Sequence, residues 1–297
     1  MRKGIDVSSY QGNIDWEEVK ENVDFAIIRC GYGNNIASQD DVYYRRNVEE
    51  CTRLGIPFGV YLFSYATDIA MSQSEVEHTL RLIKDYQLEY PVFIDIETRA
   101  QLELPKEELV KVAKHYCEEM ESHGYYVGIY ASLSTLNGIL DSNELDIYDK
   151  WVAEWSKDFT YKGKSGLWQN TDNDRIPGID TRVDGNIAFY DYPTIIREHG
   201  LNHLKKEEEP ERKFKKGDHV YVNGSVYKKE DGKEVITKVK NVPVTITSVS
   251  KKDVKAPYHL DIKGYSKEDS LSYDKLTCPS ICGRIIQFIL NLWKRSE

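Results

Sequence analysis

Cysteine is scarce in this sequence. Five cysteines occur among 297 residues, at positions 30, 51, 117, 278 and 282. Their number is odd, no two form a C-x-x-C pair, and none is grouped with histidine as in a zinc site. A disulfide framework and a structural zinc are therefore not expected. Cys30 and Cys117 stand in apolar runs and are interpreted as buried thiols.

Long hydrophobic segments are missing as well. The first residues, MRKGIDVSSYQG, contain no apolar core of the kind found in signal peptides. No later run approaches the roughly 20 apolar residues that span a bilayer. We therefore expect a chain that is synthesised in the cytoplasm without a signal peptide and has no integral membrane span. A substrate outside the cell would require release by another route.

Positive charge is sparse in the first two thirds of the chain. Residues 1–200 hold 20 Lys and Arg against 35 Asp and Glu, a net charge of −15, whereas residues 201–297 hold 20 against 14, a net charge of +6. Such a change of sign predicts two units with different partners. The acidic unit argues against nucleic-acid binding. The basic unit suits a polyanion, such as teichoic acid, nucleic acid or a membrane surface, or it is an ordinary solvated surface.

Short apolar segments alternate with helical patterns in the first two hundred residues. Helical spacing of apolar residues predicts helices at 73–86 and 106–123. The continuously apolar segments are typical of parallel strands covered on both faces. We predict an α/β fold, an irregular (β/α)8 barrel of the TIM type over residues 1–200. An open doubly wound sheet is the alternative, but no G-x-G-x-x-G follows the first strand. The expected strands are 4–7, 25–30, 57–63, 92–96, 126–130, 151–155, 166–169 and 186–190.

The remainder of the chain consists of three segments that differ in composition and in the spacing of apolar residues. The polar run at 201–212 is typical of a linker. Residues 213–277 alternate apolar and polar positions around Asn-Gly and Asp-Gly turn signals, which predicts a small all-β barrel. Residues 278–297 place apolar side chains on one helical face. We expect a short terminal helix docked on a partner surface, with an interfacial membrane helix as the alternative.

Two acids end a buried segment in the run PVFIDIE. Strand geometry places Asp95 and Glu97 on one face with Cβ atoms ~6.5–7 Å apart. From there the carboxyl groups can converge to the ~5–5.5 Å of retaining glycosidases or stay nearer the inverting range. Close carboxylates also push their pKa values apart, so that one stays protonated as an acid. A metal site or a salt bridge at a strand end is the competing interpretation.

Two further acids strengthen the acid–base interpretation. Asp6 ends the first expected strand, and Asp184 opens the last. The first and last strands of a closed barrel are neighbours, so these two side chains should lie side by side. Metal-dependent hydrolysis usually needs histidine ligands, and none of the seven histidines falls in an expected barrel strand. The pattern therefore favours acid–base chemistry without a metal or cofactor.

Aromatic residues accompany the same strand ends. The sequence has 21 tyrosines, and Tyr combines an apolar face with a polar tip, which suits a surface that stacks on sugar rings. For any single ring, core packing is the alternative. Together they favour a saccharide cleft. The candidate substrate-binding residues are Tyr61, Phe63, Tyr65, Tyr130, Trp155, Trp168 and Gln169.

The motifs, in their order, resemble the lysozymes of glycoside hydrolase family 25. They are GIDVSSYQGNIDW, AIIRCGYG, GVYLFSYA, FIDIE, GIYAS, WVAEW, LWQNT and VDGNIAF. The resemblance implies a barrel that cleaves the β-1,4 bond between N-acetylmuramic acid and N-acetylglucosamine with retention. It makes Glu97 the general acid and gives Asp95 an assisting role, in which it stabilises the transition state or orients the acetamido group.

The same resemblance implies roles for further residues. Asp6 and Asp184 would tune the acid and bind sugar, and Arg29, Tyr61 and Gln169 match motif positions. One departure is visible, because many relatives carry histidine where this chain has Leu62. Two alternatives are a barrel that binds wall glycan without cutting it and a chitinase-like hydrolase.

The segment KFKKGDHVYVNGSVY resembles the bacterial SH3-type wall-binding modules of phage and prophage endolysins. This resemblance implies an SH3-like domain at 213–277 that binds peptidoglycan and anionic wall polymers. It also implies an endolysin that acts on the bacterial wall after release by a holin. The tail at 278–297 matches nothing in such modules, and surface contact or self-association is the role we expect for it.

Overall fold

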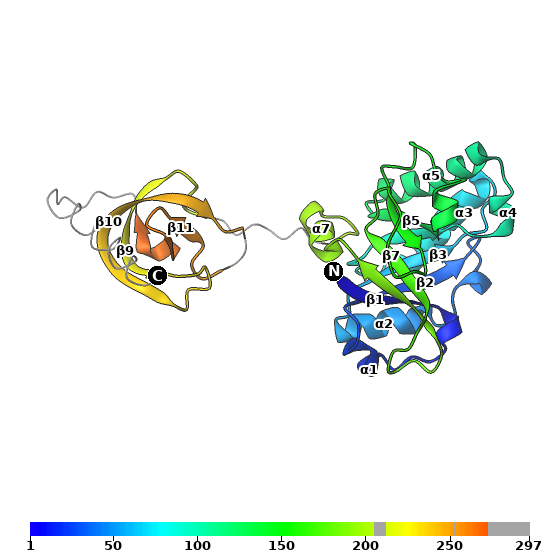
Figure 1. The fold of residues 1–297 in the computed structure, drawn as a ribbon, viewed down its shortest axis with the longest axis horizontal. Coiled ribbons are helices and arrows are strands. Elements are labelled where there is room, and N and C mark those ends of the chain that lie inside the picture. The colour runs from blue at the N-terminus through cyan, green and yellow to red at the C-terminus, as the bar shows by residue number, and fades with distance from the viewer. Residues whose placement is uncertain (205–211, 252–253, 273–297) are drawn as a thin grey trace. The chain divides into compact units, whose positions relative to one another are not determined.

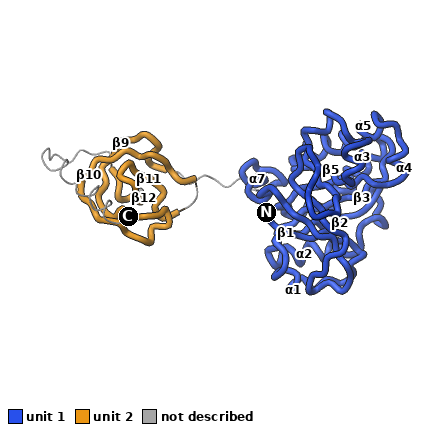
Figure 2. Tube along the Cα trace, in the orientation of Figure 1, with its two compact units in different colours: residues 1–207 blue, residues 208–297 orange. Residues whose placement is uncertain are grey.

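The chain forms two compact units, Met1–Glu207 and Glu208–Glu297 (Figure 2). The computed structural model describes residues 1–204, 212–251 and 254–272. The predicted tail at 278–297 and most of the predicted linker lie outside the described residues. Each unit has its own hydrophobic core. In the described ranges, no helix is both long and apolar enough to cross a membrane.

The first unit is a closed eight-stranded barrel in the order β1 to β8, with helices outside it (Figure 1). This confirms the predicted mixed α/β barrel. The strands are β1 (Arg2–Val7), β2 (Phe25–Tyr32), β3 (Phe58–Phe63), β4 (Val92–Asp95), β5 (Val127–Ser132), β6 (Asp149–Ala153), β7 (Leu167–Asp174) and β8 (Val183–Ala188). The helices are α1 (Trp16–Lys20), α2 (Tyr44–Leu54), α3 (Ile69–Ile83), α4 (Arg99–Leu102), α5 (Lys106–Ser122), α6 (Leu133–Leu136) and α7 (Tyr192–His199).

The last strand runs against its neighbours. Strands β1 to β7 pair in parallel, whereas β8 is antiparallel to both β7 and β1. No helix connects β7 to β8, so the chain turns straight back. The strand also begins three residues earlier than the predicted 186. This reversal matters for the site, because it brings the beginning of β8 to the end of the barrel where β1 to β6 finish.

Side chains alternate between the inside of the barrel and the layer under the helices. On β4, Val92 and Ile94 belong to the core beneath the helices, whereas Phe93 packs inside the barrel with Trp151. Gly128 leaves the space for the Phe93 ring, because a Cβ there would lie 2.5 Å from it. The next inward position on β4 is Asp95. An apolar interior layer therefore supports a polar layer at the carboxyl ends of the strands.

The barrel unit extends beyond residue 200, where the sequence predicted a linker. Asn202 is buried, and its Nδ2 donates to the carbonyl oxygens of Leu88 and Tyr90 at 2.9 and 3.1 Å. Leu204 is buried in the same unit. The polar composition of this segment obscured these contacts, because a short amide side chain can close a barrel end as well as face solvent.

The second unit is an all-β sheet of five strands with the order β10-β11-β12-β9-β13 and a further β10–β9 pairing. The Asp231–Gly232 turn joins β9 to β10, as predicted. The predicted turn at Asn223–Gly224 is wrong, because both residues lie inside β9. They pair with the part of β10 where the register shifts, and Asn223 Oδ1 accepts a hydrogen bond from the Asn241 amide there. The strands are β9 (His219–Tyr227), β10 (Val235–Val249), β11 (Tyr258–Leu260), β12 (Gly264–Ser266) and β13 (Leu271–Ser272).

Candidate active site

A cavity of about 170 Å³ opens at the barrel end where β1 to β6 finish. Nine of the twelve predicted site residues line it, including all four predicted carboxylates. In barrels of this type, the carboxyl ends of the strands carry the catalytic side chains. The lining residues are Asp6, Val7, Ser8, Tyr10, Gln11, Arg29, Tyr61, Phe63, Asp95, Glu97, Tyr130, Trp151, Gln169 and Asp184.

Asp6 and Asp184 are direct register partners across the antiparallel β1–β8 pair. Burial, followed by the charge of Asp184, raises the pKa of Asp6 well above its ordinary value, and a hydrogen bond with Asp184 acts in the same direction. Burial and the charge of Asp172 raise the pKa of Asp184 to about 6, whereas the bond with Asp6 lowers it. Burial is therefore the main cause of the raised pKa of both carboxyl groups, and the charge of Asp184 raises the pKa of Asp6 further.

Asp95 ends β4 inside the barrel and is 4% exposed. Its Oδ1 is buried without a hydrogen-bond partner among the described residues. Burial raises its pKa well above the ordinary value, the charges of Glu97 and Asp6 raise it further, and the charge of Arg29 lowers it. A carboxyl oxygen with no partner in a cavity wall is available to a ligand donor.

Glu97 stands at the exposed mouth of the same cavity, two residues beyond the end of β4. Partial desolvation, and after it the charge of Asp184, raises its pKa. A raised pKa keeps a carboxylic acid protonated closer to neutral pH, as a general acid requires. Among the described residues, no group of three His, Cys, Asp or Glu side chains is arranged to hold a metal ion.

Two residues absent from the sequence prediction complete the network around Asp6. Asp6 Oδ2 accepts from Asn186 Nδ2 at 2.7 Å and from Gln169 Nε2 at 3.0 Å. Asn186 Oδ1 in turn accepts from Trp151 Nε1 at 2.8 Å. Asn186 lies in the VDGNIAF motif, two residues after Asp184 on the inward face of β8. The period of two along a strand was the signal that could have identified it.

The predicted aromatic residues divide into three groups. Tyr61, Phe63 and Tyr130 line the cavity. Tyr65 and Trp155 lie outside that lining but are exposed, and the Trp155 Nε1 donates to Gln169 Oε1 at 3.0 Å. Trp168 is 7% exposed and packs against Phe159 and Phe189, with its Nε1 bonded to a backbone carbonyl. The structure thus gives Trp168 a packing role and leaves the exposed rings free to meet a ligand.

Leu62, the departure from relatives noted in the sequence, does not face the cavity. It is fully buried in the core under the helices, while its neighbours Tyr61 and Phe63 line the cavity. The alternation of β3 therefore turns position 62 outward from the barrel. The side chain at position 62 therefore contributes nothing to the cavity wall.

A buried carboxyl group lies beneath the loop that follows β3. Glu75 on α3 is fully buried, and its two oxygens accept from Ser64 Oγ and the Tyr65 amide, both at 2.7 Å. Gln101 Nε2 donates to the same Ser64 oxygen at 2.8 Å. Burial raises the pKa of Glu75 to about 7. The loop that carries Tyr65 is thereby fixed to α3 by a titratable group.

We expect Glu75→Gln to change how stability depends on pH. The unfolded chain releases the Glu75 proton near pH 4.5, whereas the folded chain retains it to about pH 7. Its stabilising contribution is therefore complete below pH 4.5 and is lost as pH rises to 7, by roughly 3 kcal/mol. Denaturant unfolding at pH 4.5 and 8 measures this. Glu77→Gln, exposed on the same helix, is the control, and an equal pH dependence of wild type and Glu75→Gln would contradict the expectation.

Comparison with known proteins identifies the family. Residues 5–179 match the profile of Glycosyl hydrolases family 25. The autolytic lysozyme of Clostridium acetobutylicum is 26% identical over 188 residues, covering 61% of this chain and 54% of the relative. The protein YegX of Escherichia coli K12, itself uncharacterized, is 27% identical over 195 residues, covering 62% of this chain and 68% of the relative.

Comparison with a solved structure supports the same family. The modular autolysin LytC of Streptococcus pneumoniae, in complex with a synthetic peptidoglycan ligand, is 30% identical with a TM-score of 0.56. The match covers 62% of this chain and 46% of LytC, so this chain spans about half the length of that autolysin. The family profile covers more than half of the present chain, and its residues include Asp6, Asp95 and Glu97. The chain therefore belongs to Glycosyl hydrolases family 25 and is a glycoside hydrolase of the lysozyme type.

Proposed function

We propose that this chain is an N-acetylmuramidase that cleaves the β-1,4 bond between N-acetylmuramic acid and N-acetylglucosamine in peptidoglycan. The observation that carries the proposal is the Asp95–Glu97 pair in one cavity, with both pKa values raised. Neither acid takes part in an ion pair among the described residues. The lysozyme and autolysin relatives support peptidoglycan as the substrate.

In this proposal Glu97 is the general acid. Glu97 is exposed at the cavity mouth, so it can reach the glycosidic oxygen and regain its proton from water. Protonation of the leaving oxygen lets the C–O bond break as positive charge develops on the sugar ring. Attack on the anomeric carbon by a carboxylate or by the substrate's acetamido oxygen, followed by water, accounts for retention.

Asp95 is the proposed assistant. Its unpartnered Oδ1 can accept a hydrogen bond from the acetamido N–H of the substrate. Such a bond, together with the positive charge of the transition state, stabilises the ionised form of Asp95 against the desolvation that raises its pKa. The negative charge of Asp95 then stabilises the transition state, in which the sugar is most positive, more than the ground state. This lowers the activation barrier of the cleavage step.

Asp6 and Asp184 are proposed to tune the acid and to bind sugar. The charge of Asp184 contributes to the raised pKa of Glu97, so the pair keeps Glu97 protonated. Two amide donors, from Gln169 and Asn186, hold the Asp6 side chain in place. The sugar hydroxyls would meet the remaining oxygen atoms of this pair.

The proposal is tested by offering the enzyme two insoluble glycans. We expect purified Gram-positive walls to release soluble fragments and chitin to release few. Preferential digestion of chitin would favour a chitinase-like enzyme. Binding to walls with no soluble product would favour a glycan-binding barrel that does not cut.

We further propose that the second unit is an SH3-like domain that binds walls. We compare the full chain with the fragment 1–207, both carrying Glu97→Gln to prevent digestion. At least about tenfold stronger sedimentation with walls is expected for the full chain, because two linked binding modules add avidity. If anionic wall polymers are the ligand, added salt reduces the difference. Equal sedimentation of both proteins would show that the second unit does not contribute.

The endolysin role is part of the same proposal. In it, the chain is made in the cytoplasm and acts on the bacterial wall after release. Expression together with a membrane-permeabilising holin should lyse a Gram-positive host, whereas expression of the chain alone should not. Rapid lysis without the holin would argue for another route to the wall.

A further inference from the structure

Arg29 reaches the cavity from β2 and is held there by an acid from the following loop. Its Nε and Nη2 both lie 2.8 Å from Asp41 Oδ2, and the Nη2 also donates to Ser9 Oγ at 2.8 Å. The Asp41 side chain is buried. Its Oδ2 also accepts from the Ser9 amide at 2.8 Å. Asp41 therefore fixes both the guanidinium and the Ser9–Gln11 turn, whose Tyr10 lines the cavity.

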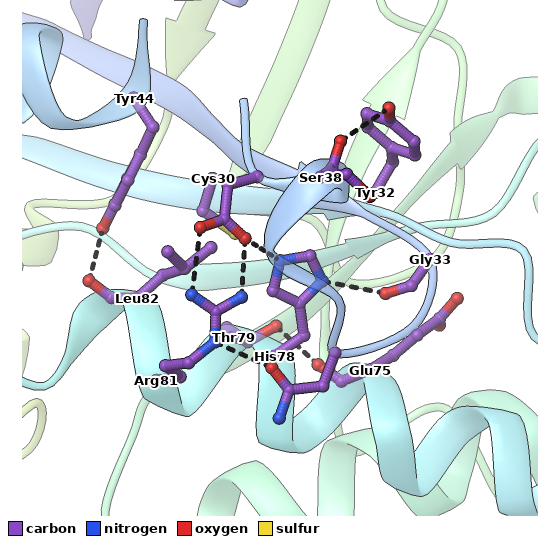
Figure 3. Close-up of polar contacts among 12 residues, drawn as sticks. Cys30, Tyr32, Gly33, Ser38, Tyr44, Glu75, His78, Thr79, Arg81 and Leu82 are labelled. Atoms are coloured by element: carbon purple, nitrogen blue, oxygen red, sulfur yellow. Dashed lines mark hydrogen bonds and ion pairs between the residues drawn. The ribbon is translucent and has the colours of Figure 1, made fainter. Parts of the chain in front are cut away.

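The preceding residue, Asp40, is fixed to α3. Its two carboxylate oxygens accept from Arg81 Nη2 at 2.6 Å and Nη1 at 3.0 Å. His78 Nε2 lies 2.9 Å from Asp40 Oδ1. Figure 3 shows His78 and Arg81 close together on the helix, with both side chains directed at the loop that contains Gly33 and Ser38. A bidentate Arg–carboxylate pair fixes geometry as well as charge.

His78 joins this loop at two points. The ring is fully buried, and its Nδ1 lies 2.9 Å from the Gly33 carbonyl oxygen. The two ring nitrogens thus contact the two ends of the same loop, the Gly33 carbonyl oxygen and the Asp40 carboxylate. Gly31 provides the space, because a Cβ there would lie 2.8 Å from the ring. The loop from Gly33 to Asp40 is thus closed onto α3 by hydrogen bonds.

We propose that Asp40 and Asp41 form a connector that positions Arg29 in the active site, with His78 and Arg81 as its anchor on α3. The two adjacent carboxylates bond to different parts of the barrel, since Asp40 bonds to α3 and Asp41 bonds to the cavity wall. The Asp41 amide also donates to the Cys30 carbonyl at 3.0 Å, next to Arg29 on β2. Asp40, Asp41 and His78 are positioning residues for the proposed muramidase, and this inference rests on that proposed function.

The connector matters because of what Arg29 does in the cavity. Arg29 is the one cationic side chain among the described residues that line it. Its charge lowers the pKa of Asp95, against the effects of burial, Glu97 and Asp6. Displacement of the guanidinium should therefore make Asp95 harder to ionise. A residue that holds Arg29 in place consequently acts on catalysis through Asp95, beyond any effect on folding.

The test is a double-mutant cycle on soluble peptidoglycan glycan fragments. Asp41→Asn and Arg29→Gln are each expected to lower kcat/KM by about tenfold or more. In the connector account, the double variant loses little beyond Arg29→Gln alone, within about twofold, because Asp41 acts through Arg29. Losses that multiply in the double variant would overturn the proposal.

The pH profile separates positioning from simple destabilisation. In Asp41→Asn, the acidic limb of kcat/KM should move to higher pH, because Asp95 loses the charge that favours its ionised form, while Glu97 and Asp6 still face it. An unmoved limb would overturn the proposal. If Asp41→Asn does not fold, the same double-mutant cycle is measured with Asp40→Asn and Arg29→Gln. We then expect a smaller loss of kcat/KM and a shift of the acidic limb in the same direction.

Asp149→Asn is the matched control. Asp149 is a buried carboxylate of the same barrel outside the cavity, and it accepts from Tyr192 Oη at 2.6 Å and from two backbone amides. Its variant should lower Tm and leave kcat/KM and the acidic limb unchanged. A wild-type chain that releases no glycan fragments contradicts the proposed function. Active wild type with multiplying losses contradicts the connector alone.

Discussion

Glu97→Gln is expected to slow the clearing of Gram-positive walls by about 10²–10⁴-fold, because glutamine has the shape of the acid but no proton to donate. The side chain is exposed, so the free energy of unfolding should change by no more than about 0.5 kcal/mol. Turbidity clearance and thermal unfolding of the same preparation measure the two effects.

The control for this variant is Glu107→Gln, which removes an exposed carboxylate from the first turn of α5, away from the cavity. It should clear walls at the wild-type rate. In the wild type, activity should fall as pH rises through the raised pKa of Glu97, since the acid form is the active one. Near-normal clearing by Glu97→Gln would contradict the assignment of the acid.

Asp95→Asn is expected to lower activity by about 10²–10³-fold and, at neutral pH, to stabilise the fold. The loss follows from removal of a charge that faces the developing positive charge of the sugar. The stabilisation follows from burial, which raises the pKa of Asp95 and makes its ionised form costly. The gain should be roughly 1 kcal/mol at pH 7, as found when strained active-site groups are replaced.

The pH dependence of that gain has a defined sign. Below the ordinary pKa of an aspartic acid, wild-type Asp95 is protonated in both the folded and unfolded states, so the two proteins should be about equally stable. The wild type should then lose stability relative to Asp95→Asn as pH rises. Denaturant unfolding at pH 3.5 and pH 7 measures it. A variant that is less stable at pH 7 would show that the ionised carboxylate supports the fold.

The position of the proposed catalytic carboxylates could be predicted because side chains alternate along a strand and the two acids stand at the end of an apolar segment. Alternation along β4 places Val92 and Ile94 in the core under the helices and turns Asp95, the last residue of the strand, into the cavity. The meeting of Asp6 with Asp184 was also predicted. The prediction did not include the reversal of β8, without which a residue at the start of that strand would lie at the opposite end of the barrel from Asp6.

Hydrogen-bond partners could not be predicted in the same way. The period of two could have placed Asn186 on the same face as Asp184, but nothing in the sequence pairs it with Asp6 or with Trp151, to which it forms two successive bonds. Trp168 matched a motif like the cavity residues, but its strand turns the ring toward Phe159 and Phe189. A motif gives the chain position of a side chain, whereas its direction depends on strand register, which long-range pairing determines.

The contacts between the loop acids and α3 were the least predictable feature of the site. The acids Asp40 and Asp41 occur in a polar run without a catalytic motif, and His78 stands in a helix where spacing suggested only an amphipathic face. Their association requires β2 and α3 to pack together, with residues separated by almost forty positions. Such contacts between distant segments leave no local pattern in a single sequence. These contacts can be identified only from the folded structure.

The muramidase activity is tested most directly by identifying the new chain ends in a wall digest. Purified peptidoglycan is treated with the wild-type chain, the products are reduced, and mass spectrometry identifies the sugar at each reducing end. The account predicts N-acetylmuramic acid at every new end, and no release by Glu97→Gln. New reducing ends of N-acetylglucosamine would contradict it.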